Sequence, residues 1–369
     1  MKKQLAFAQF GAAARRIGAL ALGLIICTLG PGLSASAQQG TFTTFDAPGA
    51  ATGNGFGTVA LSINPAGAIM GYYNDANAVF HGFLRARDAT IATFDPPGSA
   101  FTIPGSINSP GTIAGFYFDA GFVPHGFLRA RDGTFTTFDL PAGSFVVTSG
   151  PPSINPEGAI TGTYLDASFG PRGFLHAPDG TFTTFNAPDA SGTFANSINP
   201  AGAIAGYYFI VTIEPSFSIV FHGLLRAPDG TITTFDVPGA LDTFATSNSI
   251  NPAGTISGNY YDASDVSHGY LRAPDGTFTT FDVPGAGTGA FQGTGLFGVG
   301  INAVGAIAGT YTDASNVVHG FLRTRDGTIT TYDPPGSVGT FADSINPAGA
   351  ITGSFTDASG TIHGFLREP

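Results

Sequence analysis

The chain has 369 residues, among them 54 Gly, 34 Phe and no Trp, and only 11% of its residues are charged. This composition favours short strands joined by tight turns and excludes a mainly helical protein. The formal net charge of −11 at pH 7 excludes binding of nucleic acid or anionic lipid through a basic surface.

Residues 1–37 have the features of an export signal. A basic start is followed by the apolar stretch Ile17–Leu29 and by Ala35-Ser36-Ala37, which fits a signal-peptide cleavage site. The apolar stretch has 13 residues, fewer than the ~20 that span a bilayer as a helix. We therefore expect cleavage after Ala37 and a secreted or periplasmic protein that is not bound to a membrane. Arg15-Arg16 leaves open whether export follows the general or the twin-arginine route.

The remaining chain, residues 38–369, is predicted to be a single acidic domain. Residues 1–37 contain four of the 14 basic residues, including both Lys, and the one cysteine, Cys27. The rest has 10 Arg against 25 Asp and Glu, a formal charge of −15. Without cysteine it can form neither a disulfide nor a thiolate metal site. We expect a monomer without a nucleic-acid or membrane partner.

Three short signatures each occur seven times along this domain. The first is a Thr/Phe-rich strand ending in Asp or Asn, at Thr41–Asp46, Thr90–Asp95, Thr134–Asp139, Thr181–Asn186, Thr231–Asp236, Thr277–Asp282 and Thr328–Asp333. The second is Ile-Asn before a turn, with its asparagines at Asn64, Asn108, Asn155, Asn199, Asn251, Asn302 and Asn346. The third resembles His-Gly-Phe-Leu-Arg and starts at His81, His125, Arg172, His222, His268, His319 and His363. The steps from His81 to His363 average 47 residues, a period typical of propeller blades.

Each repeat is predicted to contribute four antiparallel strands. In the first complete repeat, a strand ending in Asn64 is followed by strands at Ala68–Tyr73, Phe80–Ala86 and Thr90–Asp95. The last two strands form a hairpin, whose turn in the fifth repeat is Ala-Pro-Asp-Gly, ending at Gly276. Pro suits a type I turn, and Gly supplies the positive φ that the chain needs to re-enter the sheet. Four strands in an up-and-down order make one blade of a β-propeller.

The order of strands at the two ends predicts a closed ring. The domain begins with a lone fourth strand, Thr41–Asp46, and ends with a lone third strand, Ile362–Arg367. Pairing these two strands would complete a seventh blade and leave no free sheet edge. The alternative is an open β-solenoid, which does not need this permutation and would instead have atypical capping repeats. We therefore predict an all-β, seven-bladed β-propeller with four-stranded antiparallel blades over residues 38–369.

The motifs resemble the HAF-type extracellular repeats of bacterial exported proteins. The resemblance rests on Ile-Asn-x-x-Gly-x-Ile-x-Gly-x-Tyr, on His-Gly-Phe-Leu, and on Asp-Gly-Thr-Phe-Thr-Thr followed by Asp and Pro-Gly-Ala, and it covers Thr41 to Arg367. It implies an exported, propeller-like repeat protein and assigns no activity. Arg172 in place of His and Asn186 in place of Asp depart from the pattern, which would matter if the His or the Asp carried chemistry.

The repeated histidines are interpreted as structural pins: His81, His125, His222, His268, His319 and His363. The symmetry of a ring keeps equivalent residues apart, so they cannot converge on one ion, and no metal site is predicted. A His on the third strand lies near the Asp that ends the fourth strand and the Asp of the preceding turn. We expect hydrogen bonds between them, similar to the His–Asp contacts of WD-repeat blades.

The sequence contains no G-x-S-x-G, H-E-x-x-H or P-loop motif. His176 occupies the Arg position of its repeat and is interpreted as a swap with Arg172, and Glu157 as a solvated charge. The turns at Asp75, Asp119, Asp166, Asp262, Asp313 and Asp357 carry one or two acids each. A calcium site needs six to eight oxygens, so these are predicted to be Asx-turns. No catalytic residue and no cofactor are predicted.

Variation in loop length is confined to one face of the predicted propeller. The turns between second and third strands share this face with the crossovers between blades. The longest are 209–221, with Glu214 and Phe217, and 284–300, with Phe291, Gln292 and Phe297. These five residues are the candidate ligand-binding residues, because loops on a rigid scaffold often carry binding functions. The alternative is that the Phe side chains pack under their own loops.

Three functions are compatible with the sequence. The first is a non-catalytic binding or scaffold module for an extracellular or envelope polymer or protein. The second is a lyase or hydrolase with a site near the central channel, by analogy with other propellers. It would need ionisable residues such as Glu214, Arg172 and His176 to lie together. The third is a surface or matrix role without a small ligand.

Overall fold

The computed structural model of the chain describes residues 40–141, 145–146, 152–214 and 216–369, so the predicted export signal lies outside the described residues. Within these ranges every regular element is a β-strand. The described residues form no helix with the length and apolarity needed to span a bilayer.

The first strands along the chain are β1 (Thr41–Phe45), β2 (Thr58–Ile63), β3 (Ile69–Asn74), β4 (Phe80–Arg85), β5 (Ile91–Phe94), β6 (Ser99–Ile107), β7 (Ile113–Asp119), β8 (Pro124–Arg129), β9 (Phe135–Asp139), β10 (Phe145–Val146), β11 (Ser153–Ile154), β12 (Ile160–Leu165), β13 (Pro171–His176) and β14 (Phe182–Phe185). They are followed by β15 (Gly192–Ile198), β16 (Ile204–Thr212), β17 (Ser218–Arg226), β18 (Ile232–Phe235), β19 (Asp242–Phe244), β20 (Ile256–Tyr261), β21 (Ser267–Arg272), β22 (Phe278–Phe281), β23 (Gly293–Ile301), β24 (Ile307–Thr312), β25 (Val318–Arg323), β26 (Ile329–Tyr332), β27 (Ser337–Ile345), β28 (Ile351–Asp357) and β29 (Ile362–Glu368). The hairpin turn in the fifth repeat has the predicted positive φ, 91° at Gly276.

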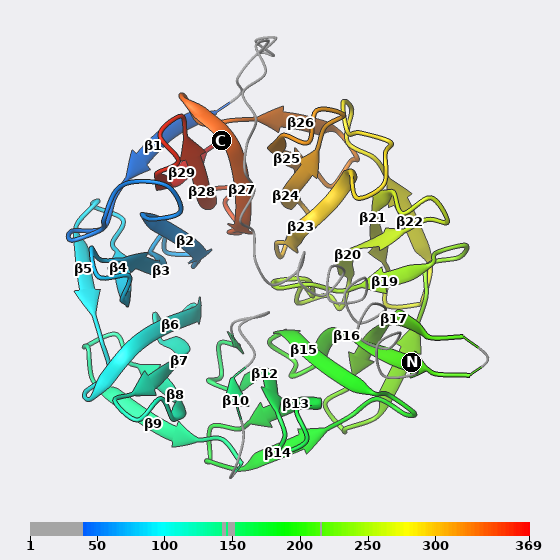
Figure 1. Ribbon diagram of the computed structural model, residues 1–369, viewed down its shortest axis with the longest axis horizontal. Helices are drawn as coiled ribbons and strands as arrows, with labels where there is room; N and C mark the ends of the chain where they lie inside the picture. The colour runs from blue at the N-terminus through cyan, green and yellow to red at the C-terminus, as the bar shows by residue number, and fades with distance from the viewer. Residues whose placement is uncertain (1–39, 142–144, 147–151, 215) are drawn as a thin grey trace, which may run out of the picture.

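The strands form antiparallel meanders of four. Three sheets have the orders β2-β3-β4-β5, β6-β7-β8-β9 and β15-β16-β17-β18, and in a fourth sheet both β10 and β11 pair with β12 before β13 and β14. The meanders β19–β22 and β23–β26 are counted as one eight-stranded sheet, because a parallel contact pairs Ser267 with Gly293. The sheets stand around a common centre, with β2, β6, β15, β23 and β27 toward the centre and β5, β9, β14 and β26 at the rim (Figure 1).

The remaining sheet, β1-β29-β28-β27, joins the two ends of the described chain. β1 pairs antiparallel with β29, with Phe42 opposite Arg367 and Thr44 opposite Phe365. The ring of Phe42 lies 6.0 Å from that of Phe365 and 5.9 Å from that of Tyr332 in the neighbouring sheet. The pairing of the terminal strands predicted from the sequence is therefore present, and β1 also packs between two sheets.

Close packing explains the glycine that follows each repeated His. A Cβ atom at Gly126 would lie 2.1 Å from the ring of Phe138, and one at Gly82 would lie 2.4 Å from the ring of Phe94. Only Gly therefore lets the aromatic ring of the fourth strand lie directly over the third strand. In this position the ring of Phe94 also contacts that of Phe127 in the next sheet, at 6.3 Å, and fills the space between the two sheets.

The repeated asparagines form a circle of hydrogen bonds that links the sheets at the ends of their first strands. The side-chain amide of each donates to the backbone carbonyl of the next: Asn64 to Asn108 (3.3 Å), Asn108 to Asn155 (3.0 Å), Asn155 to Asn199 (3.4 Å), Asn199 to Asn251 (3.3 Å), Asn251 to Asn302 (3.5 Å), Asn302 to Asn346 (2.9 Å) and Asn346 back to Asn64 (3.4 Å). The side-chain oxygen also accepts a bond within its own turn, as Asn108 does from the N–H of Thr112 at 2.8 Å. These side chains are buried, and each stabilises its own turn and links its sheet to the next one.

Candidate binding surface

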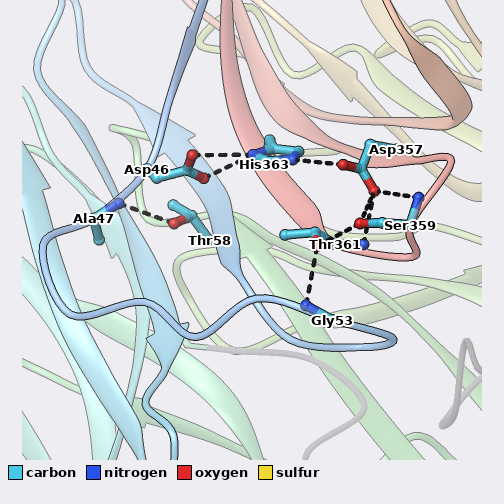
Figure 2. A network of polar contacts seen from close by, with 8 residues as sticks. All are labelled: Asp46, Ala47, Gly53, Thr58, Asp357, Ser359, Thr361 and His363. Carbon is cyan, nitrogen blue, oxygen red and sulfur yellow. Dashed lines mark hydrogen bonds and ion pairs between the residues drawn. The ribbon is translucent and has the colours of Figure 1, made fainter.

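The repeated histidines bind the aspartates that end the fourth strands. The distances from histidine Nδ1 to the carboxylate are His81–Asp95 2.7 Å, His125–Asp139 2.6 Å, His222–Asp236 3.0 Å, His268–Asp282 2.8 Å, His319–Asp333 2.8 Å and His363–Asp46 3.0 Å. Figure 2 shows the last pair, which joins β29 to the residue that follows β1. These contacts tie the third strand to the fourth, as expected of a structural pin.

Five of these histidines lie between two carboxylates. Nε2 faces the aspartate of the preceding turn at 3.8 Å in His81–Asp75, 3.6 Å in His125–Asp119, 3.5 Å in His268–Asp262, 3.6 Å in His319–Asp313 and 3.4 Å in His363–Asp357. Burial alone would lower the pKa of His319, but its hydrogen bonds to Asp333 and Asp313 and the charges of these carboxylates raise it. The same balance, with Asp46 and Asp357, raises the pKa of His363. The folded state therefore favours the protonated form of both rings.

This arrangement predicts that stability falls as the pH rises. The pKa values of His319 and His363 are higher in the folded chain than in the unfolded one. Their stabilising contribution is therefore complete below about pH 6.5 and is lost as the pH rises through the folded-state values. We expect the midpoint of urea unfolding, measured at constant ionic strength, to fall from about pH 6 upward. Replacing both rings, His319→Gln with His363→Gln, should make this dependence shallower without abolishing it, because the pKa of Asp343 is also raised in the folded chain, and an unchanged slope would contradict the assignment.

The third repeat replaces the pin with a different contact. Arg172 occupies the His position and donates from Nε to Asp166 in the preceding turn, at 2.9 Å. Asn186 replaces the strand-end Asp and donates to the carbonyl of Ala190 at 3.0 Å. The two substitutions therefore go together: each residue has its own partner, and the side chain of Arg172 joins the third strand to the turn and not to the end of the fourth strand.

A second contact repeats from sheet to sheet. It lies at the end of each third strand that is farther from the repeated histidine. The guanidinium of the repeated Arg lies over an aromatic ring of the neighbouring sheet, as Arg129 lies over Phe94 at 5.0 Å. In the third repeat His176 takes this place and stacks on Phe138 with ring centroids 4.4 Å apart, and burial lowers the pKa of His176. Sequence reasoning missed this cation–π contact. Its signal is the recurrence of Arg on the third strand and of an aromatic residue on the fourth strand in the repeats other than the third, where His176 replaces Arg.

The aspartate turns are closed by hydrogen bonds to their own backbone. In the first, Asp75 Oδ1 accepts from the N–H of Asn77 at 2.8 Å and from that of Val79 at 2.9 Å. The bond to the residue two positions on is the Asx-turn predicted from the sequence. Among the described residues, no group of three or more His, Cys, Asp or Glu side chains is placed to hold a metal ion.

We call the turns between second and third strands, together with the crossovers between sheets, the loop face. Of the predicted ligand residues, Glu214 is exposed and Phe217 is half-buried in the loop between β16 and β17. Phe291 is 47% exposed and packs edge-on against Tyr261 at 6.2 Å. The amide of Gln292 donates to the carbonyl of Ala314 and to Asn316, and thereby ties the crossover to the next turn. The side chain of Phe297 lies outside the described residues.

Large exposed hydrophobic side chains gather on the loop face. Those that belong to it are Phe122, Val123, Phe169, Ile213, Leu241 and Phe291, whereas Val304 lies on the opposite face. The most exposed aromatic residues, Phe122 at 68% and Phe169 at 66%, were missed in the sequence because their turns have the length of ordinary aspartate turns. They widen the predicted surface beyond the two long loops.

The backbone at these residues adopts a conformation that Phe disfavours. Phe122, Phe169 and Phe291 have φ values of 59°, 61° and 60°. At the position of Phe122 and Phe169, other repeats have Asn316 and Gly360, residues that tolerate this left-handed region. A bulky residue held there is strained, and such strain is typical of functional sites.

Relieving this strain should stabilise the fold. We expect Phe169→Asn to raise the free energy of unfolding by about 1 kcal/mol, because Asn tolerates positive φ and the lost side chain is mostly exposed. Phe122→Asn should gain less, because its ring also contacts that of Phe101 at 5.8 Å. Urea unfolding measures both. The control Ser168→Asn, in the same turn but without positive φ, should change stability by less than about 0.5 kcal/mol; equal gains at 168 and 169 would refute the strain.

One carboxyl near the centre has a strongly perturbed pKa. Asp343 is the extra residue of a bulge in β27, and its backbone carbonyl accepts a bond from the side chain of Asn248 at 3.2 Å. Its Oδ2 atom is buried without a hydrogen-bond partner, and burial raises the pKa of Asp343 to about 8. The ionisable residues that the enzyme hypothesis requires to lie together are apart from one another. Arg172 and His176 lie near opposite ends of β13, and Glu214 lies in the loop after β16.

Comparison with solved structures identifies the fold class. The β-propeller domain of the trilobed protease from Pyrococcus furiosus, described as having an open velcro topology, matches with a TM-score of 0.58 at 10% identity, over 85% of this chain and 94% of that one. Puromycin hydrolase matches with a TM-score of 0.53 at 13% identity, over 81% of this chain and 50% of the hydrolase. No protein-family model and no curated protein matches the sequence. The chain therefore has a β-propeller fold, and at these identities the likeness extends to the fold alone.

Proposed function

We propose that residues 38–369 form a closed, seven-bladed propeller of the HAF-type repeat family that acts as an exported, non-catalytic binding module. Support for the closed ring comes from the pairing of β1 with β29 and from the asparagine circle, which passes through each of the repeats and returns to Asn64. Support for the family comes from the repeat motifs. The ligand is an extracellular or envelope polymer or protein, bound at the loop face.

The observation that carries this proposal is the set of strained, exposed aromatic residues Phe122, Phe169 and Phe291. Exposed Phe lowers solubility, and positive φ lowers stability, so both effects oppose Phe at these positions unless it makes a contact. All of them lie on the loop face. Glu214 and Phe217 extend this surface along the loop between β16 and β17.

A binding screen against glycans and cell-envelope components tests the proposal. The mature domain is compared with a variant in which 209–221 is replaced by Asp-Ala-Ser, and with the triple variant Phe122→Asn, Phe169→Asn, Phe291→Asn. We expect a ligand whose affinity falls at least tenfold in the triple variant, while urea unfolding shows that the variant is at least as stable as the native domain.

The matched control is Val304→Asn, which removes an exposed apolar side chain from the opposite face. It should bind as the native domain does. The proposal is overturned if no component binds, or if the loop-face variants bind with unchanged affinity.

An enzyme with a site near the centre is the second candidate, and the raised pKa of Asp343 favours it, because general acid–base catalysis needs a group that titrates near neutral pH. Hydrolase and lyase substrates would be turned over by the native domain and not by Asp343→Asn. Equal rates for the two proteins would end this candidate.

Export is tested separately. Protein recovered from the medium or the periplasm should begin at Gln38, and the fraction that contains it distinguishes the two compartments. An N-terminus at Met1 in the recovered protein would contradict export by a cleaved signal.

A further inference from the structure

The loop face carries most of the acidic residues of the domain. They are the strand-end residues Asp46, Asp95, Asp139, Asp236, Asp282 and Asp333, the turn residues Asp75, Asp119, Asp166, Asp262, Asp313 and Asp357, and also Asp189, Glu214 and Asp265. All of these side chains are exposed or half-buried. Within the described residues, Arg172 is the one arginine of this face, and the others lie at the opposite ends of the third strands or in the turns that follow.

This separation gives the two faces different electrostatic character. On the opposite face, each aspartate of the turn between third and fourth strands is matched by a nearby arginine or histidine; for example, Asp132 and Arg129 interact electrostatically. On the loop face the strand-end aspartates contact histidines instead of arginines, and each carboxylate keeps part of its surface in water. A field of one sign over one face attracts ligands of the opposite sign and repels others.

Each strained aromatic residue is joined to one of these acids. The backbone N–H of Phe122 donates to the carbonyl of Asp119 at 2.9 Å, that of Phe169 to Asp166 at 2.8 Å, and that of Phe291 to Asp265 at 2.7 Å. An aromatic residue and an acidic residue thus share one turn at Phe122 and at Phe169, and they lie on two hydrogen-bonded loops at Phe291. A Lys or Arg side chain can use both groups at once, because the ring attracts a cation over its face and the carboxylate pairs with it.

We propose that the partner of the loop face is a polypeptide segment rich in Lys and Arg that also carries apolar side chains. This inference rests on the binding function proposed above and names its ligand class. Anionic polymers are disfavoured by the charge of the face, and a neutral glycan would make no use of that charge. The apolar neighbours Ile213 and Leu241 provide contacts for the apolar side chains of the segment.

Fluorescence anisotropy with labelled dodecapeptides tests this. The probes are (Lys-Ala-Phe-Lys)3 and the matched acidic peptide (Glu-Ala-Phe-Glu)3, with the whole mature domain. We expect saturable binding of the basic peptide only, weakening about tenfold or more between roughly 50 and 300 mM NaCl. The variant Asp189→Asn, Asp265→Asn, Glu214→Gln removes three charges from the loop face and should weaken binding about tenfold.

The matched control removes three charges from the opposite face, through Glu157→Gln, Asp179→Asn and Asp229→Asn, and should change binding less than twofold. Equal losses in both triple variants would mean attraction to net charge alone and would overturn the proposal, as would equal binding of both peptides. If the basic peptide fails to bind while the Phe variants abolish binding of a neutral glycan, the binding function stands and the ligand class is wrong. If neither the basic peptide nor a glycan binds, both the proposed binding function and the proposed ligand class are wrong.

Discussion

A domain that starts at Ala47, and so lacks β1, should show no cooperative unfolding transition. β1 covers the edge of β29, and its removal exposes Phe365, which is fully buried in the intact domain. It also removes Phe42 from between two sheets and takes Asp46 away from His363. These losses together are comparable with the whole stability of a domain, about 5–15 kcal/mol. Urea unfolding followed by tyrosine fluorescence measures the change.

The control for this truncation is a chain that starts at Gly40, which should unfold as the full mature domain does. Adding a synthetic peptide of residues 40–47 to the shorter chain should restore the transition in a concentration-dependent way, because the peptide supplies the missing strand. A truncated domain that unfolds cooperatively at the native midpoint would show that β1 is dispensable, and the closed ring would fail with it.

Breaking one link of the asparagine circle should cost about 2–4 kcal/mol. Asn108→Ala removes one of the two hydrogen bonds to the carbonyl of Asn155, which keeps its bond from the N–H of Gly158, and leaves the partly buried N–H of Thr112 without its side-chain partner. A lost hydrogen bond costs about 0.5–1.5 kcal/mol, and an unpaired buried group costs about 1–3 kcal/mol. Asn346→Ala breaks the link that returns to Asn64 and should cost a similar amount if the ring is closed. Chemical denaturation of the two variants gives both values.

The exposed variant Asn77→Ala serves as the reference for these two. Asn77 bonds only within its own turn, to Asp75, so its loss should change stability by less than about 0.5 kcal/mol. Suppose that Asn346→Ala lowers the free energy of unfolding as little as Asn77→Ala does, while Asn108→Ala lowers it strongly. The bond from Asn346 to Asn64 would then not stabilise the fold, and the circle would be open at that point.

The sequence predicted the elements that local chemistry determines. The strand at Phe278–Phe281 lies within the predicted Thr277–Asp282, because a run of Thr and Phe between Gly276 and Pro284 strongly favours a short strand. The His–Asp contacts were also predictable, since the hairpin register places His268 near Asp282. Repetition strengthened each of these predictions, because the same pattern had to satisfy every sheet.

Contacts between sheets were harder to predict, because they depend on how far neighbouring repeats rotate about the centre. The asparagines were recognised as a repeated feature, yet nothing local shows that the amide of Asn108 reaches the carbonyl of Asn155. Gln292 was predicted as a ligand residue, and its place beside Asn316 follows from the path of a long crossover. The exposure of Phe169 depends on the tilt of a short turn. Periodicity predicts register along a strand, but it does not predict contacts between neighbouring sheets or the exposure of a side chain in a turn.

The pairing of β1 with β29 also sets the order in which the protein can mature. Residues 41–45 are synthesised before their partner strand, residues 362–368, so β1 can pair only after the strands between them have been made. Until then this strand of Thr and Phe has an unpaired edge, which invites association with other chains. A chain with this order of strands gains from a chaperone that covers β1 until β29 is available to pair with it.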